Sequence, residues 1–191
     1  IVVTARKRKE TLLEVPVAAT AIDGNTLAAR GINSVREAAV LAPGLNINSD
    51  GAGRAFVAIR GVGVTLVQSV QPGVGLFVDG IYRPNTAYLN NPLLDIERIE
   101  VLRGPQGTLY GRNTSAGVIN IITNRPGEEW EANLSATVGN YNTRKVSGAL
   151  NIPVSDGIRQ RFAALSIERD GYSYNEFTGN NVDGRDAYEV R

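Results

Sequence analysis

The feature that most constrains the fold of this chain is a pair of alternating runs after Gly127. In the first run every second side chain is apolar, at Trp130, Ala132, Leu134, Ala136 and Val138. The second run repeats the pattern at Val146, Gly148, Leu150, Ile152 and Val154. Each run predicts a strand with one apolar face, about as long as a tilted strand that crosses a bilayer. Half-buried sheets of soluble proteins alternate in the same way, so the pattern alone leaves both structures open.

A third run, residues 159–169, alternates less regularly. We expect its apolar face to consist of Ala163, Leu165 and Ile167. A short turn at residues 155–157 precedes this run, and a longer polar segment at residues 171–185 follows it. Short turns that alternate with longer loops are typical of the two ends of an outer-membrane barrel. The aromatic residues Trp130 and Tyr141 lie near opposite ends of the first run, where interfacial aromatic girdles belong.

Residues 1–126 predict a different architecture, in which short helices lie among short strands. One helix is expected at residues 25–30, and a second follows a capping box of Ser34 and Glu37 and continues to Leu41. Asp79 and Gly80 indicate a hairpin turn between strands at residues 76–78 and 81–82. Further strands are expected at residues 15–22, 56–60, 96–102 and 117–123. In residues 96–103 charged and apolar side chains share both faces, which suits a small domain in a polar, wet enclosure.

Composition excludes several kinds of function. The sequence contains no Cys and no His, which excludes thiol and imidazole catalysis, disulfides and the usual zinc sites. A net charge of +1 gives no reason to expect nucleic-acid binding. No apolar run reaches the roughly 18 residues that a transmembrane helix needs. No signal peptide is visible, so we take the chain to be a mature or trimmed product.

Oxygen-bearing side chains imitate two kinds of chemical site. Asn46, Asn48 and Asp50 resemble the start of an EF-hand loop, but Val57 occupies the position of its final glutamate. Four acidic residues could supply a catalytic pair: Asp79, Asp95, Glu97 and Glu100. Nothing in the sequence brings two of them into one cleft, as paired-acid catalysis requires. We therefore expect no enzyme, no metal site and no cofactor.

One stretch is far more specific than the patterns above. Residues 96–126 read IERIEVLRGPQGTLYGRNTSAGVINIITNRP, which resembles the end of the plug domain in TonB-dependent outer-membrane receptors. Four further segments follow the order of that family: IVVTA at residues 1–5, APGL at 42–45, IRG at 59–61 and FVDGIY at 77–82. The resemblance implies an α+β plug domain, a small mixed sheet with short helices, followed by the first antiparallel strands of a transmembrane β-barrel.

The family's architecture also implies how the chain is divided. Its members are 22-stranded barrels filled by an N-terminal plug, and three or four strands cannot close a barrel. We expect all or part of a TonB box at residues 1–6 and the plug domain at residues 7–126. Residues 127–191 are expected to form the first three to four strands of an incomplete barrel, so the chain is a fragment of a 22-stranded barrel protein.

The resemblance further implies a function. Family members import scarce ligands, typically iron–siderophore complexes, across the bacterial outer membrane with energy delivered by TonB. The expected partners are TonB, a small-molecule metal chelate and outer-membrane lipid, with no nucleic acid. The expected location is the outer membrane, with the N-terminus in the periplasm. The alternative is a signalling or docking receptor of the same fold.

Two groups of residues acquire roles from the resemblance. The TonB-coupling residues are Ile1, Val2, Val3, Thr4 and Ala5. A β-prone, untethered segment of this kind can add as a strand to the edge of a partner's sheet. Arg60 and Arg103 correspond to the plug arginines that pair with barrel glutamates and hold the plug in the pore.

The remaining candidates lie in turns and loops. We expect Gly104, Pro105, Gly107, Gly111 and Gly117 to serve the backbone of a tight turn rather than any chemistry. In the family the apical plug loops face the outside and form the floor of the ligand site. Three segments are candidates for these loops: residues 48–54, 62–72 and 82–91. The side chains expected to face ligand are Arg54, Tyr82, Arg83, Asn85, Tyr88, Asn90 and Asn91.

Overall fold

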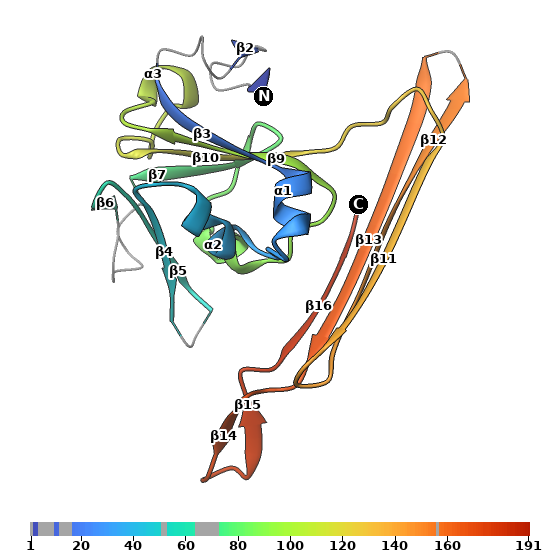
Figure 1. Cartoon of the computed structure of the whole chain (residues 1–191). Coiled ribbons are helices and arrows are strands. Elements are labelled where there is room, and N and C mark those ends of the chain that lie inside the picture. Colours follow the sequence, from blue (N-terminus) through green and yellow to red (C-terminus); the bar gives the residue numbers. More distant parts are fainter. Residues whose placement is uncertain (1, 4–9, 12–16, 51–52, 64–72, 156) are drawn as a thin grey trace. The chain divides into compact units, whose positions relative to one another are not determined.

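The computed structural model describes residues 2–3, 10–11, 17–50, 53–63, 73–155 and 157–191 (Figure 1). These residues fall into two compact units, Ile1–Thr123 and Asn124–Arg191. The division therefore follows Thr123, whereas the sequence analysis places it after Pro126. No described helix is long and apolar enough to cross a membrane.

A five-stranded mixed sheet forms the centre of the first unit. Its strand order is β3-β9-β10-β7-β8. Four pairings are involved, of which only β10 with β7 is parallel. The strands are β3 (Ala18–Asp23), β9 (Ile96–Arg103), β10 (Gly117–Thr123), β7 (Val74–Val78) and β8 (Ile81–Tyr82). Strand β3 begins at Ala18, and the first two residues of the strand predicted at 15–22 lie outside the described residues.

Two smaller sheets accompany the central one. Strands β4 (Leu45–Ser49), β5 (Ala55–Ile59) and β6 (Val62–Gly63) form an antiparallel sheet of three strands. Strands β1 (Val2–Val3) and β2 (Glu10–Thr11) form a short antiparallel pair. The predicted hairpin between β7 and β8 is present, with Asp79 and Gly80 both at positive φ, as its turn requires.

Short helices connect these strands. Helix α1 (Gly24–Ala29) begins after Asp23, whose carboxylate accepts a hydrogen bond from the Thr26 amide. Helix α2 (Val35–Ala38) has Ser34 as its N-cap, as predicted, but the Glu37 carboxylate accepts from the Asn33 amide rather than from Ser34. Three further short helices complete the set: η1 (Ala39–Leu41), η2 (Thr86–Asn90) and α3 (Gly107–Tyr110).

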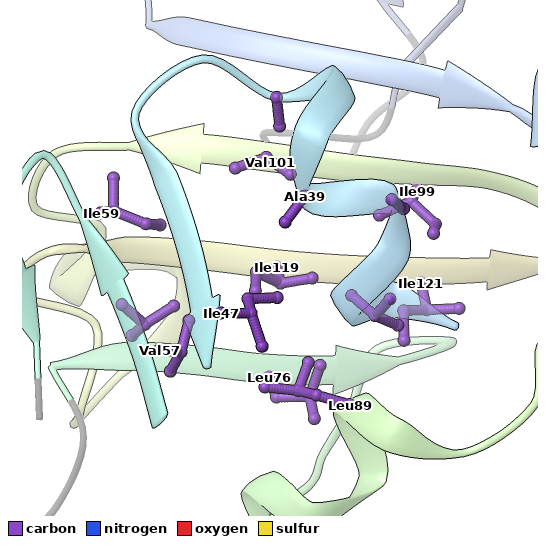
Figure 2. Close-up of a cluster of buried hydrophobic side chains, with 14 of the residues drawn as sticks. Ala39, Ile47, Val57, Ile59, Leu76, Leu89, Ile99, Val101, Ile119 and Ile121 are labelled. Atoms are coloured by element: carbon purple, nitrogen blue, oxygen red, sulfur yellow. The ribbon is translucent and has the colours of Figure 1, made fainter. Parts of the chain in front are cut away.

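The main core lies on one face of the five-stranded sheet. Ile99 and Val101 of β9 and Ile119 and Ile121 of β10 point into it and are fully buried. Figure 2 shows these side chains surrounded by residues from the other elements: Ala39, Ile47, Val57, Ile59, Leu76 and Leu89. Burial of each such aliphatic side chain contributes roughly 1.5–3 kcal/mol, so this cluster is the main source of stability in the unit.

The opposite face of the sheet combines apolar and charged side chains. Val3 packs there with Phe77, Leu102 and Val118 in a second, smaller cluster. Beside it Arg98 and Glu100 are buried and form an ion pair, with Arg98 Nε donating to Glu100 Oε1 at 2.8 Å. Residues two apart on a strand share a face, so the opposite charges of Arg98 and Glu100 neutralise each other inside the unit, whereas the Glu97 side chain stays 44% exposed.

The second unit is a four-stranded antiparallel sheet. Strands β11 (Glu131–Gly139), β12 (Thr143–Ser155), β13 (Ile158–Arg169) and β16 (Arg185–Val190) follow one another in the sheet. The segment between β13 and β16, predicted as a polar loop, contains a small hairpin of β14 (Ser173–Asn175) and β15 (Asn180–Val182). The expected apolar faces of β11 and β12 coincide, since Ala132 pairs with Leu150 and Leu134 with Gly148.

The predicted apolar face of β13 lies opposite to the exposed apolar face of β11 and β12. Leu150 pairs with Phe162 and Gly148 with Ala164, so Phe162 and Ala164 share the exposed apolar face of β11 and β12. Ala163, Leu165 and Ile167 lie on the other face and are buried. Both faces of β13 carry apolar residues, and the pairing register with β12 decides between them.

Candidate functional site

The predicted coupling segment folds back on its own unit. Val2 pairs with Thr11 and Val3 with Glu10, and the Val3 side chain is only 1% exposed. Ile1, Thr4 and Ala5 lie outside the described residues. The sequence predicts an untethered segment here. In the structure the second apolar cluster covers Val3, because a β-branched aliphatic side chain gains free energy by leaving water.

Arg103, one of the two predicted lock residues, makes its contacts inside the first unit. Its Nη1 donates to the Pro43 carbonyl at 2.8 Å and its Nη2 to the Thr20 hydroxyl at 2.5 Å. Its Nε lies 3.5 Å from the Ala18 carbonyl, at the limit of a hydrogen bond. The guanidinium therefore connects the end of β9 with the start of β3 and with the turn that follows η1.

Arg60, the other predicted lock residue, occupies a tight turn. It has a φ of 52° and precedes Gly61 at 79°, and its amide donates to the Gly44 carbonyl at 2.7 Å. Its side chain is exposed. Among the described residues no carboxylate lies within ion-pairing distance of either Arg60 or Arg103.

The predicted glycine-rich turn joins β9 to β10. Gly104 and Gly111 have φ values of 95° and 81°, which side-chain-bearing residues rarely adopt. A Cβ at Gly117 would lie 2.3 Å from the Leu102 carbonyl oxygen, so this position cannot accept a side chain without movement of β9. Gly107 differs, because it opens helix α3 with space around it. Pro105 lies between Gly104 and Gln106, whose amides both bond to the segment leading into β10.

Two of the three predicted ligand loops lie side by side. The side-chain amide of Asn90 donates to the Gly53 carbonyl at 3.0 Å, and the Thr86 hydroxyl donates to the Ala55 carbonyl at 2.6 Å. Arg54, next to Gly53, forms an ion pair with Asp50 at 2.5 Å. The tip of the β4–β5 hairpin and helix η2 therefore form one surface.

Helix η2 and the residues beside it carry the other predicted ligand residues of this surface. The Arg83 guanidinium lies over the Tyr88 ring, 5.7 Å from its centroid. Asn85 caps the helix by accepting from the Ala87 amide, and Asn91 follows its last residue. Of the remaining loop, residues 62–72, only 62 and 63 are among the described residues.

Tyr82 does not belong to this surface. Its ring lies 5.5 Å from that of Phe77, and its hydroxyl accepts from Asn113 at 2.9 Å. These contacts place Tyr82 with the second apolar cluster, on the sheet face that Val3 covers.

A buried polar group on that same face was not predicted as a site. Glu100 is 1% exposed and Asn120, directly opposite on β10, is 5% exposed, with its Nδ2 donating to Glu100 Oε2 at 3.4 Å. Burial, with a further contribution from the Glu100 charge, raises the pKa of Tyr110 to about 12, so its phenol stays protonated. The spacing of Arg98 and Glu100, two residues apart with opposite charges, was the available signal for the pair.

Asp79, predicted as a turn residue, has a further role at the end of the unit. Asp79 accepts from both the amide and the hydroxyl of Thr123, each at 3.0 Å. Thr123 is the last residue of β10 and of the first unit. The turn between β7 and β8 therefore holds the point where the chain leaves for the second unit.

Comparison with known proteins identifies the family. The sequence profile described as the TonB-dependent Receptor Plug Domain matches residues 11–118. The Pesticin receptor of Yersinia pestis is 31% identical over 186 residues, which are 95% of this chain and 27% of that receptor. The Ferrioxamine B receptor of Salmonella typhimurium is 27% identical over 168 residues, or 87% of this chain and 23% of that receptor.

A solved structure agrees with the sequence matches. The ferric yersiniabactin uptake receptor FyuA from Yersinia pestis matches with a TM-score of 0.79 and 29% identity, over 91% of this chain and 28% of that one. The chain spans about a quarter of the length of the relatives that it matches. It belongs to the family of TonB-dependent receptors, and the mixed sheet of its first unit is their plug domain.

Proposed function

We propose that this chain is the plug and the first barrel strands of an outer-membrane receptor that imports a siderophore-type metal chelate with energy from TonB. The observation that carries the proposal is the plug-domain match over residues 11–118, followed directly by strands with an exposed apolar face. Relatives named for ferrioxamine B and ferric yersiniabactin support a metal chelate as the ligand. A receptor and transporter of this kind needs no catalytic residue of its own.

The N-terminal segment is the proposed coupling element, located in the periplasm. A two-residue strand that already pairs with β2 can exchange that pairing for the edge of a partner's sheet. To do so, Val3 must leave the cluster of Phe77, Leu102 and Val118. Coupling to TonB in this way links withdrawal of the segment to exposure of one face of the plug sheet.

The surface formed by the β4–β5 hairpin and η2 is the proposed plug part of the ligand site. Arg83 stacked on Tyr88 presents a cation beside an aromatic face, and Arg54 lies in the adjoining hairpin. Such a combination suits an anionic chelate. Arg60 and Arg103 remain the proposed lock toward carboxylates of the complete barrel, where each buried pair would resist separation.

A docking function is the second candidate. It is favoured by one observation, the name Pesticin receptor of a relative that matches 95% of this chain. A receptor used only for docking would bind its ligand without energised uptake, so transport distinguishes the two functions.

Uptake by a full-length receptor that carries this chain tests the proposal. Val3→Pro removes a backbone donor and fixes φ, so it should abolish energised uptake of a ferric chelate while chelate binding stays intact. Val3→Ile, which keeps the β-branch and the donor, is the matched control and should transport normally. Normal uptake by the proline variant would contradict the coupling role, and binding without uptake in the unaltered receptor would favour docking.

The ligand surface needs a separate measurement. Arg83→Ala and Tyr88→Ala should each weaken chelate binding to the full-length receptor, because each removes half of the stacked pair. Asn46→Ala, on strand β4 but outside the three candidate loops, controls for changes to this region in general. Unchanged affinity in both variants would move the site away from η2.

A further inference from the structure

Strand β3 is the element of the plug sheet that tension from the N-terminus would reach first. It lies at the edge of the sheet, and among the described strands its one partner is β9. Ala18, at its N-terminal end, is opposite Arg103, and Asp23 at its other end is opposite Arg98. A pull that enters through the N-terminal segment therefore acts first on the pair of Ala18 and Arg103.

The side chains of β3 hold it unevenly. Ile22, near the far end, is the only residue of the strand that is buried in the main core. Near the pulled end Ala18 is exposed, Ala19 is half-buried, and Val17 packs only partly against the second cluster. Small, half-exposed side chains contribute little free energy of burial. Apart from backbone hydrogen bonds, the contact between Arg103 and Thr20 is the main tie at this end.

Arg103 makes that tie rigid. Its planar guanidinium donates to the Thr20 hydroxyl on β3 and to the Pro43 carbonyl, two groups that lie 83 and 60 residues away in sequence. Bonds from both Nη atoms fix the plane of the fork, which a lysine ammonium could not do. We refer to Arg103, Thr20 and the Pro43 carbonyl as the β3 clasp.

We propose that the β3 clasp sets the resistance of the plug to tension from the coupling segment, so that it must open before β3 can leave the sheet. The inference rests on the proposed coupling to TonB. It adds Thr20 as a positioning residue, because its hydroxyl holds Arg103 across β3. The clasp does not exclude a lock to the barrel. A guanidinium has five N–H donors, and the three contacts seen here leave two for a carboxylate.

A substitution at Thr20 distinguishes the two roles proposed for Arg103, the β3 clasp and the lock to the barrel. Thr20→Val keeps the shape of the side chain and removes the hydroxyl that accepts from Arg103. Arg103 itself is unchanged and can still reach a barrel carboxylate. Hydrogen exchange of the full-length receptor should show amides of β3 exchanging roughly tenfold faster in Thr20→Val, the factor expected for one charge-assisted hydrogen bond. Amides of β10 should not change, and Thr20→Ser, which restores the hydroxyl, should return β3 to its normal rate.

Two results would overturn the clasp. One is unchanged exchange of β3 in Thr20→Val, and the other is an equal increase in β3 and β10, which would indicate general destabilisation. Single-molecule pulling on the N-terminus of the same receptor gives a second test, in which β3 should separate at lower force in Thr20→Val than in Thr20→Ser. Neither readout depends on transport. Normal uptake by Val3→Pro would therefore remove the coupling proposal while the exchange data still decide on the clasp.

Discussion

The two units of this chain place their apolar side chains in opposite ways. In the plug, Ile99, Val101, Ile119 and Ile121 are at most 1% exposed. In the second unit, Leu134 and Val138 are 83% and 85% exposed, on a sheet face with a continuous row of apolar residues. The same residue types thus build a closed interior in one unit and an outer surface in the other. The exposed apolar face supports the proposal that the second unit faces the hydrocarbon phase of a membrane, whereas the plug encloses its own core.

Removal of one charge from the buried pair should have the largest effect on the plug. Glu100→Ala removes the buried carboxylate partner of Arg98 and leaves it the more exposed Glu97, so it should cost up to about 3–5 kcal/mol of plug stability. Protection of plug amides from hydrogen exchange in the full-length receptor measures this loss. The double variant Arg98→Met with Glu100→Leu should recover most of it. Equal instability of the single and double variants would show that the pair itself is not the cause.

The same truncation in both units tests the contrast directly. Ile119→Ala should cost about 2–5 kcal/mol, because it leaves a cavity in a sealed core. Val138→Ala on the exposed face should change stability by less than about 1 kcal/mol, because no protein cavity forms. Denaturation of the full-length receptor measures both losses. Comparable losses at the two positions would contradict the difference between the two units.

A charge on the exposed face probes its solvent. Leu134→Arg should destabilise insertion of the full-length receptor into lipid vesicles by about 2–4 kcal/mol if this position lies near the bilayer midplane. Ser135→Arg, one residue along and on the opposite face of β11, is the matched control and should be tolerated. If both variants insert equally well, the apolar face does not meet lipid.

The smallest effect is expected at a helix terminus on the plug. The Asp23 carboxylate accepts from the amide and the hydroxyl of Thr26, and these bonds lower its pKa below 3.8. Because the folded state has the lower pKa, this stabilisation is present above pH 3.8 and is lost as the pH falls through the lowered value. Asp23→Ala should cost about 1 kcal/mol at neutral pH and less in acid. A loss that does not depend on pH would assign the effect to something other than the carboxylate.

Local signals in the sequence were sufficient to predict much of the secondary structure of the plug. The cap at Ser34 and the turn at Asp79 and Gly80 depend on residues only a few positions apart, and both are present. The face of β13 could not be decided in this way, because both of its faces are apolar and pairing with β12 sets the register. The contacts of Arg103 could not be predicted from the sequence either, because Thr20 and Pro43 are distant from it in the chain.

The order of the strands has a consequence for how the plug folds. Strand β10 is the last of the plug to be synthesised, yet it lies in the middle of the sheet between β9 and β7. The parallel pairing of Gly117 with Val74 and of Ile121 with Val78 closes a loop of more than forty residues. Such non-local pairings form slowly, because the entropy of loop closure is lost before the contacts are gained. The sheet therefore cannot be completed until Thr123 has left the ribosome, and β9 and β7 stay without their common neighbour β10 until then.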